Sequence, residues 1–237
     1  MPPFDVIAFD ADDTLWHNMR LYLQTQAGLA ALLSSYGISA KALEERLSQT
    51  EGRNILVFGY GLKSFTLSMI ETAVELTGGS LSGPDVLAIL SLARAQLAAP
   101  IVLLEHAMEV VSSLAARHRL MLITKGDVLD QESKLARSGL GEFFREIEVV
   151  SDKTAQSYTD LFRNHAIDPR RVLMVGDSLR SDILPVLELG GWAVYIPYPG
   201  AWLHEAAAAP LPGTPRFYQL EQLAQLPDLL DQVEAEG

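Results

Sequence analysis

The 237-residue sequence contains no cysteine. Disulfide bonds and thiolate chemistry are therefore excluded, and a cytoplasmic setting is the natural expectation. Long uncharged apolar runs are also missing, so we expect no segment that spans a membrane. The first residues, MPPF, lead directly into an apolar run, which leaves no room for a signal peptide.

Basic residues are scarce. Lysine and arginine together number 18 against 30 acidic residues, which gives a formal charge of −12. Such a chain has no basic surface that could release counterions from a nucleic acid, so a general nucleic-acid binder is excluded. An anionic substrate would have to be attracted locally, by a metal ion or a lysine, against the overall field.

The most informative stretch follows the first predicted strand. Residues 6–9 are all apolar and suit a buried parallel strand, which ends on the acidic turn Asp10, Asp12 and Asp13. Three carboxylates within four residues repel one another and are costly to desolvate, so they call for a compensating cation. The sequence favours a magnesium site with a nucleophilic carboxylate. An acidic turn without function is the alternative if this stretch is taken alone.

The remaining pattern predicts two kinds of architecture. Between the first strand and the next one lie more than a hundred residues, which is far too long for one crossover. This interval contains four predicted helices and no strand: 21–37, 40–52, 65–79 and 84–99. Helices and strands then alternate, with strands at 119–124, 145–151, 171–178 and 192–197. We therefore expect an α/β fold, a doubly wound parallel sheet formed by residues 1–16 and 100–237, with an all-helical subdomain inserted at 17–99.

Three further strand ends carry polar residues that suit the same site. Thr124, Lys125 and Gly126 follow the second strand, where a hydroxyl and free backbone N–H groups could hold phosphate oxygens. Lys153 follows the third strand and could neutralise a carboxylate or a phosphoryl group. Asp177 and Asp182 follow the fourth and suit a hard cation. Each has a plainer explanation by itself: a capped turn, a surface lysine, a common Gly-Asp-Ser turn.

In combination these motifs resemble the haloacid dehalogenase (HAD) superfamily of hydrolases, most of which are phosphatases. FDADDTLW is similar to the first motif of that family, LITKG to the second, Lys153 to the third and VGDSLRSD to the fourth. The helical insertion is similar to the small helical cap of the family. The resemblance covers the whole chain and implies a Rossmann-like core.

The resemblance also implies roles for individual residues. Asp10 would be the nucleophile that forms an aspartyl-phosphate, and Asp12 would be the general acid and base. Thr124 and Lys153 would act in catalysis and bind the phosphoryl group, with Lys125 and Gly126 as further substrate contacts. Mg²⁺ would be held by Asp10, the backbone carbonyl of Asp12, Asp177 and Asp182. With metal and Lys153 nearby, Asp10 should stay ionised at neutral pH.

Several choices remain open at this level. Asp12 favours a phosphatase acting on a small phosphate ester, because dehalogenases and phosphonatases of the family lack a carboxylic acid there. A phosphomutase, a phosphonatase or a catalytically silent phospholigand-binding relative are the alternatives.

Lys134 is a rival for the role of Lys153, but it lies within a predicted helix. The segment 53–65 could read the leaving group. Manganese could replace magnesium, and the protein could be a monomer or a homodimer.

Overall fold

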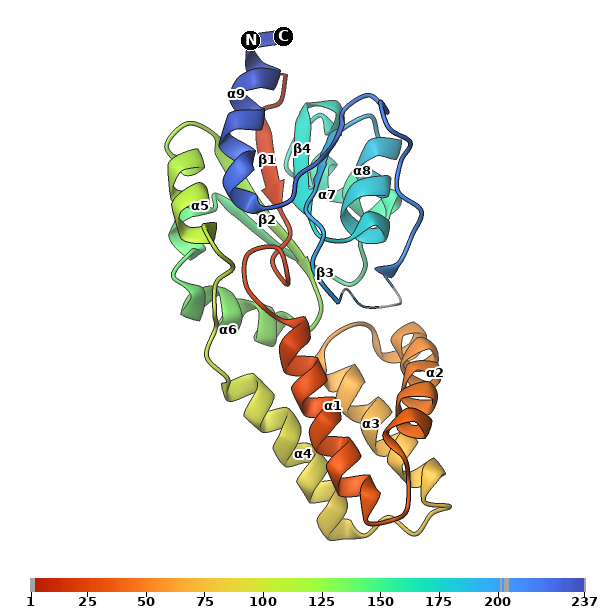
Figure 1. Ribbon diagram of the computed structural model, residues 1–237. Coiled ribbons are helices and arrows are strands. Elements are labelled where there is room, and N and C mark those ends of the chain that lie inside the picture. Colours follow the sequence, from red (N-terminus) through yellow and green to blue (C-terminus); the bar gives the residue numbers. More distant parts are fainter. Residues whose placement is uncertain (1–2, 201, 203–204, 237) are drawn as a thin grey trace. The chain divides into compact units, whose positions relative to one another are not determined.

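Figure 1 shows the computed structural model, which describes residues 3–200, 202 and 205–236. The chain divides into two compact units. The first comprises Met1–His17, Ile101–Lys125 and Gln131–Gly237, and the second comprises Asn18–Pro100 and Gly126–Asp130. Within the described part of the chain, no helix combines the length and the apolar character needed to cross a membrane.

The first unit is built on a sheet of six parallel strands. Their order is β3-β2-β1-β4-β5-β6, so the first strand lies in the middle and the order reverses between β1 and β4. This arrangement confirms the predicted doubly wound parallel sheet, and ligands of such sheets bind at the carboxyl ends of the strands near the reversal. The strands are β1 (Val6–Phe9), β2 (Arg119–Lys125), β3 (Glu146–Val150), β4 (Val172–Gly176), β5 (Trp192–Tyr195) and β6 (Phe217–Gln219).

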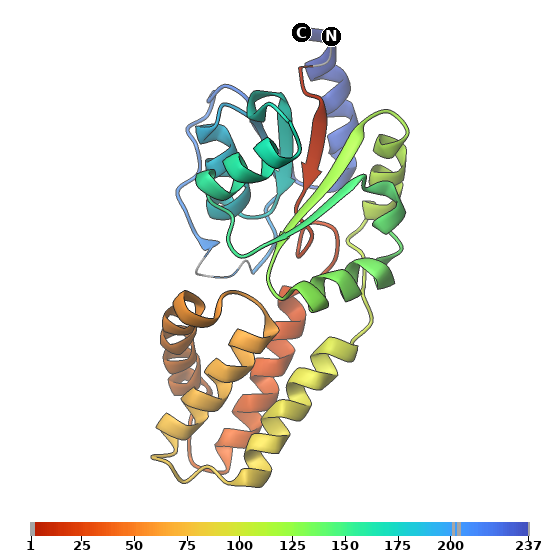
Figure 2. The ribbon, with the colours of Figure 1, turned by 180° about the vertical axis from the view of Figure 1, so that it is seen from behind.

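Both faces of the sheet are buried. Successive side chains of a strand point to opposite faces, so each strand contributes to both cores. In β1, Ile7 and Phe9 belong to one apolar core, whereas Val6 and Ala8 belong to the core on the opposite face. Figures 1 and 2 show helices on both sides of the sheet. The first core includes side chains of α5 (Ala107–Ala115), α6 (Val128–Ser138) and α9 (Leu226–Glu236). The second includes side chains of α7 (Ala155–Asn164) and α8 (Leu184–Glu188).

The second unit is helical and has a core of its own. Its helices are α1 (Met19–Ser34), α2 (Ala40–Phe58), α3 (Leu62–Leu76) and α4 (Gly83–Ala98). Each contributes fully or nearly fully buried apolar side chains, such as Leu29 from α1, Leu47 from α2, Met69 from α3 and Ile89 from α4. The unit therefore buries an apolar centre without using the sheet.

The sequence-based end of the second helix was wrong. We expected that helix to end at Gly52, but α2 continues to Phe58 and is stopped at Gly59, whose φ of 76° suits glycine. A glycine inside a helix costs only about 1 kcal/mol, which tertiary contacts can outweigh. Here Asn54 is buried and donates from Nδ2 to Ser68 Oγ (3.1 Å) and Glu71 Oε2 (2.8 Å) on α3.

Helix α3 begins without a capping side chain of its own. Its N-cap residue is Gly61, with a φ of 115°, and a Cβ there would lie 2.7 Å from the backbone nitrogen of Asp127. Asp127 instead provides the missing acceptor, because its Oδ2 accepts from the Lys63 backbone N–H at 2.9 Å. Its Oδ1 lies 3.2 Å from Lys63 Nζ. The turn after β2 is thus fixed to the start of a helix 64 residues earlier.

We expect Asp127→Ala to destabilise the helical unit by about 0.5–2 kcal/mol, the usual cost of losing an N-cap acceptor. Hydrogen exchange at the Lys63 amide should accelerate, as measured by NMR. Asp127→Asn keeps an acceptor oxygen and should lose less. Asp160→Ala, which removes a carboxylate paired with the exposed Arg163, is the matched control. Unchanged exchange at Lys63 in Asp127→Ala would contradict this capping role.

Candidate active site

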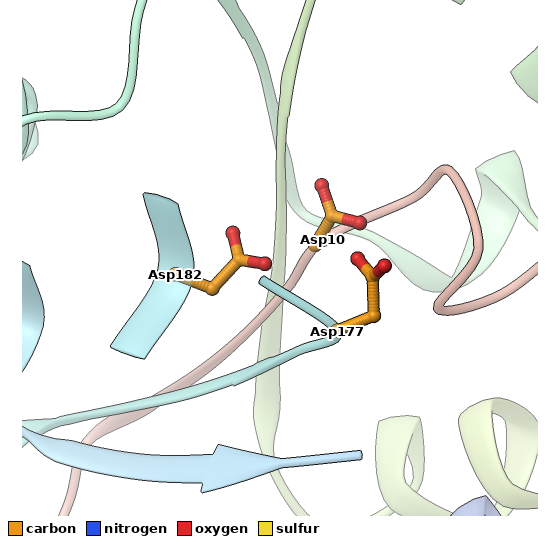
Figure 3. Close-up of side chains that lie close together, drawn as sticks. All are labelled: Asp10, Asp177 and Asp182. Carbon is orange, nitrogen blue, oxygen red and sulfur yellow. The ribbon is translucent and has the colours of Figure 1, made fainter. Parts of the chain in front are cut away.

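Three carboxylates meet where β1 and β4 end side by side. The register pairs Phe9 with Val175, and the Asp10 N–H donates to the Val175 carbonyl at 2.9 Å. Asp10, Asp177 and Asp182 each offer an oxygen, and these oxygens lie within 4.8 Å of one another. Figure 3 shows the three side chains directed toward a common point. The structure thus brings together three of the four residues that we predicted as metal ligands.

The turn after β1 is held by its own hydrogen bonds. Thr14 donates from Oγ1 to Asp10 Oδ2 at 3.0 Å and lies 3.5 Å from Asp177 Oδ1, so its hydroxyl braces two of the carboxylates. Asp13 has a φ of 65°, a conformation in which aspartate and asparagine are tolerated better than most residues. The turn is therefore shaped by DADDT itself and presents Asp10 at the end of the strand.

Lys153 lies against this carboxylate group. Its Nζ is 2.5 Å from Asp10 Oδ1 and 2.7 Å from Asp182 Oδ1, and the side chain is buried. The next residue, Thr154, is the N-cap of α7 and forms a capping box with Ser157. A capping box fixes where a helix begins, so the helix start sets the position of Lys153. Lys134, the rival lysine, lies elsewhere, against Asp12.

The loop after β4 needs glycine at position 176. A Cβ on Gly176 would lie 2.3 Å from Asp182 Oδ2, so a larger residue would displace that carboxylate. Asp182 Oδ2 also accepts from the Ser178 backbone N–H at 3.0 Å. The segment Leu179–Ile183 forms a π-helical turn before α8. The wider turn carries Asp182, and π-bulges often occur at functional sites.

In the protein alone, the negative charges of Asp10, Asp177 and Asp182 exceed the positive charge of Lys153. Burial, together with the neighbouring carboxylate of Asp182, raises the pKa of Asp10 to about 7, even though Lys153 lowers it. Burial and the neighbouring carboxylates Asp10 and Asp182 raise the pKa of Asp177 well above its ordinary value. Burial lowers the pKa of Lys153, but Asp10 and Asp182 outweigh this and raise it well above its usual range. Lys153 alone does not keep Asp10 fully ionised at neutral pH, so our expectation that Asp10 stays ionised there depends on the metal as well.

These residues fit a hard divalent cation. Asp10 and Asp182 share the ammonium group of Lys153, and Asp177 lies beside them, so the group carries an excess of negative charge. Carboxylate oxygens are the ligands that magnesium and similar ions take, and an ion there would offset the cost of burying the charges.

A family model for haloacid dehalogenase-like hydrolases matches residues 4–190, which is most of the chain. The chain belongs to the haloacid dehalogenase-like hydrolases. A solved member of this family from Xanthomonas campestris is 36% identical, covers 99% of this chain and 93% of that one, and superposes with a TM-score of 0.87. The predicted family is confirmed, and this hydrolase is an enzyme of it.

Two more distant relatives differ in activity. N-acylneuraminate-9-phosphatase from Rattus norvegicus is 26% identical over 136 residues, 55% of this chain. The match spans about half of that relative, 52% of its length. A 2-haloacid dehalogenase from Pseudomonas syringae is 19% identical, covers 97% of this hydrolase and 99% of that chain, and has a TM-score of 0.65. At such identity the dehalogenase shows a shared fold alone.

The predicted substrate contacts after β2 have different surroundings. Thr124 is buried near the end of β2, where it pairs with Val149 of β3. Lys125 donates to Ser181 Oγ at 2.7 Å and forms an ion pair with Glu205. Gly126, with a φ of 130°, begins the turn that belongs to the helical unit. Lys125 is therefore engaged with neighbouring side chains of the hydrolase.

Glu205 is a site neighbour that the sequence analysis missed. Its Oε2 accepts from Ser178 Oγ and Ser181 Oγ, both at 2.5 Å, so it braces the loop that carries Asp177 and Asp182. Burial raises the pKa of Glu205, but Lys125 and the two hydroxyls outweigh this and lower it. No sequence signal indicated the contact, because Glu205 stands in an irregular segment far along the chain.

Asp12, the fourth predicted ligand and general acid, is held by a second set of side chains. Its carboxylate accepts from Trp16, Gln131 and Lys134. The sequence analysis considered Lys134 only as a rival to Lys153 and did not select Gln131 or Trp16. The available signal was a lysine and a glutamine three residues apart on one helix face.

We expect the metal-free hydrolase to lose stability as the pH rises from about 4 to about 7. The folded pKa of Asp10 lies above its ordinary value of 3.8, at about 7, so in this window the folded state binds the proton more tightly than the unfolded state. Asp177→Asn removes one of the destabilising charges. At pH 8 without metal it should therefore melt at a higher temperature than the native protein, by roughly 2–4 °C for each kcal/mol recovered.

Calorimetry with Mg²⁺ provides the complementary measurement. Mg²⁺ should raise the melting temperature of the native protein more at pH 8 than at pH 5, and should have little effect on Asp177→Asn. Asp231→Asn changes an exposed carboxylate paired with Arg117 and should behave like the native protein. Equal Mg²⁺ shifts in the native protein and in Asp177→Asn would show that the ion is not held by Asp177.

Proposed function

We propose that this hydrolase is a magnesium-dependent phosphatase that cleaves a small phosphate monoester through an aspartyl-phosphate. The observation that carries the proposal is the buried Asp10 carboxylate 2.5 Å from Lys153 Nζ, beside Asp177 and Asp182. A carboxylate held next to a cation at the end of a core strand suits nucleophilic attack on an anionic phosphoryl group.

In the first half of the reaction, an Asp10 oxygen attacks phosphorus and the bond from phosphorus to the ester oxygen breaks. The departing oxygen takes a proton from Asp12, so the alcohol leaves neutral and the phosphoryl group stays on Asp10. Lys153 offsets the charge of the phosphoryl oxygens. Thr124 and the Gly126 backbone are proposed as further contacts of the phosphoryl group. Lys125 could contact it as well if it leaves its ion pair with Glu205.

In the second half, Asp12 takes a proton from a water molecule, which attacks the phosphorus of the aspartyl-phosphate. The bond between phosphorus and Asp10 breaks, inorganic phosphate leaves, and both carboxyl groups return to their starting state. One residue thus serves as acid and then as base, which accounts for the need for a carboxylic acid two residues after the nucleophile.

The proposed ligands of Mg²⁺ are Asp10, Asp177, Asp182 and the backbone carbonyl of Asp12. When bound, the ion would supply positive charge to the attacking carboxylate and to a phosphate oxygen. Manganese suits the same donors, so the choice between the two ions depends on availability.

Two observations favour a phosphate ester as the substrate. The curated relatives are phosphatases, and Asp12 provides the acid that an alkoxide leaving group needs, which argues against dehalogenation. We propose that the helical unit, residues 18–100, is the cap that closes over the substrate and contacts its leaving group. A phosphomutase would also keep Asp12, and it would return an isomer of its substrate instead of inorganic phosphate.

The test is phosphate release from p-nitrophenyl phosphate and from a panel of small alkyl phosphates, with and without Mg²⁺. We expect activity that requires the ion and falls to background in Asp10→Asn. A substrate with a ³²P-labelled phosphoryl group, quenched in acid, should label the native protein and leave Asp10→Asn unlabelled.

Asp5→Asn is the matched control, because Asp5 precedes the same strand but is exposed and pairs with Arg171. It should keep native activity. Full activity in purified Asp10→Asn would overturn the proposed mechanism, and quantitative conversion to an isomer without phosphate release would replace the phosphatase by a phosphomutase.

A further inference from the structure

The carboxylate of Asp12 is surrounded by nitrogen donors. Lys134 Nζ lies 3.0 Å from Oδ1 and 2.9 Å from Oδ2. Gln131 Nε2 donates to Oδ2 at 2.8 Å, and Trp16 Nε1 donates to Oδ1 at 2.7 Å. All three donor residues are buried, with exposed fractions of 6% for Lys134, 4% for Gln131 and 1% for Trp16. This set, the Asp12 cradle, consists of Trp16, Gln131 and Lys134.

The cradle uses the full hydrogen-bonding capacity of the carboxylate. An ionised carboxylate offers about four acceptor positions, two on each oxygen, and here each oxygen accepts two N–H groups. An ammonium, an indole N–H and an amide NH₂ can donate but cannot accept a proton. In this arrangement no lone pair of Asp12 is left for the proton that the general acid must give to the leaving-group oxygen, or for a hydrogen bond from water, so one donor must give way in each half-reaction.

The donors are fixed from more than one side. Gln131 and Lys134 stand three residues apart on α6 and therefore on the same helix face. Gln131 Nε2 also donates to the Lys125 carbonyl at 3.1 Å, which ties it to the end of β2. The Trp16 carbonyl accepts from the Asp13 N–H at 2.8 Å, so the indole is anchored to the acidic turn. Asp12 is thus oriented by the helix α6 and by its own turn together.

We infer that the Asp12 cradle, with Lys134 at its centre, positions the acid and base of the reaction. Lys134 contacts both oxygens, so it fixes the plane of the carboxylate, while Gln131 and Trp16 each hold one oxygen. When one donor gives way, the freed oxygen of Asp12 can carry the proton to the leaving-group oxygen while the other donors keep the carboxyl group in a defined orientation. This inference rests on the proposed function, since it assigns a purpose to residues that act through Asp12.

The first test is steady-state kinetics of Lys134→Met on two substrates. An alkyl phosphate has a poor leaving group that depends on Asp12, whereas p-nitrophenyl phosphate has a good one that needs less protonation. We expect kcat for the alkyl phosphate to fall about 10- to 100-fold with KM little changed, because misplacing a catalytic group costs this much. The loss on the aryl ester should be smaller. Gln131→Met should lower kcat for both substrates in the same order, but by a smaller factor.

A double-mutant cycle separates positioning from other roles. In the Asp12→Asn background, Lys134→Met should cause no further loss, because a residue that acts through Asp12 has nothing left to position. Losses that multiply, or a KM that rises with kcat unchanged, would overturn the inference and indicate direct substrate binding or general damage to the fold.

Folding and the proposed function are controlled separately. Lys134→Met leaves the Asp12 carboxylate without its ammonium partner, so thermal unfolding is measured for each variant. If that variant does not fold, Gln131→Met and Asp12→Asn/Lys134→Met, which keep no uncompensated charge in the pair, carry the test. Lys41→Met removes an exposed lysine and is the matched control.

Native activity in Asp12→Asn would refute the proposed function. An impaired Asp12→Asn beside native-like Lys134→Met and Gln131→Met would refute the cradle alone.

Discussion

The arrangement of this hydrolase depends on one electrostatic problem, the burial of Asp10, Asp177 and Asp182 around the ammonium of Lys153. Three negative charges and one positive charge do not balance in a medium that solvates ions poorly. The parallel sheet brings the carboxylates together because β1 lies between β2 and β4, and the two acidic loops follow neighbouring strands. The negative charge that Lys153 does not compensate requires a further cation.

Two groups of polar contacts surround that centre and divide its tasks. Thr14, Ser178 and the glycine at 176 keep the carboxylates of Asp10 and Asp182 in place. Trp16, Gln131 and Lys134 hold the carboxylate of Asp12, to which we assign proton transfer in the proposed reaction. The two lysines pair with different carboxylates: Lys153 with Asp10 and Asp182, and Lys134 with Asp12. The proposed nucleophile and the proposed acid therefore have different partners, although the two aspartates are only two residues apart in the chain.

The sequence predicts the sheet well because apolar runs that end in polar turns are local signals. The same strand ends reveal Asp10, Asp177 and Lys153, since parallel strands bring their carboxyl ends to one edge. Contacts between segments that are far apart in the sequence give no such local signal. Glu205 reaches Ser178 and Ser181 from an irregular segment, and Lys134 looks like any helical lysine until its partner is known. The length of α2 was missed for the same reason, because burial of Asn54 against α3 overrides Gly52.

The central position of β1 has a consequence for how the protein is made. Residues 6–9 leave the ribosome long before their partners, which are residues 119–122 on one side and 172–175 on the other. The helical unit draws its core from residues 29–89, so it can complete that core while β1 still has no neighbour. Since domains generally fold as units during synthesis, the helical unit precedes the sheet. The three carboxylates assemble only after β4 has emerged, so a chain interrupted before that point lacks Asp177 and Asp182 of this group.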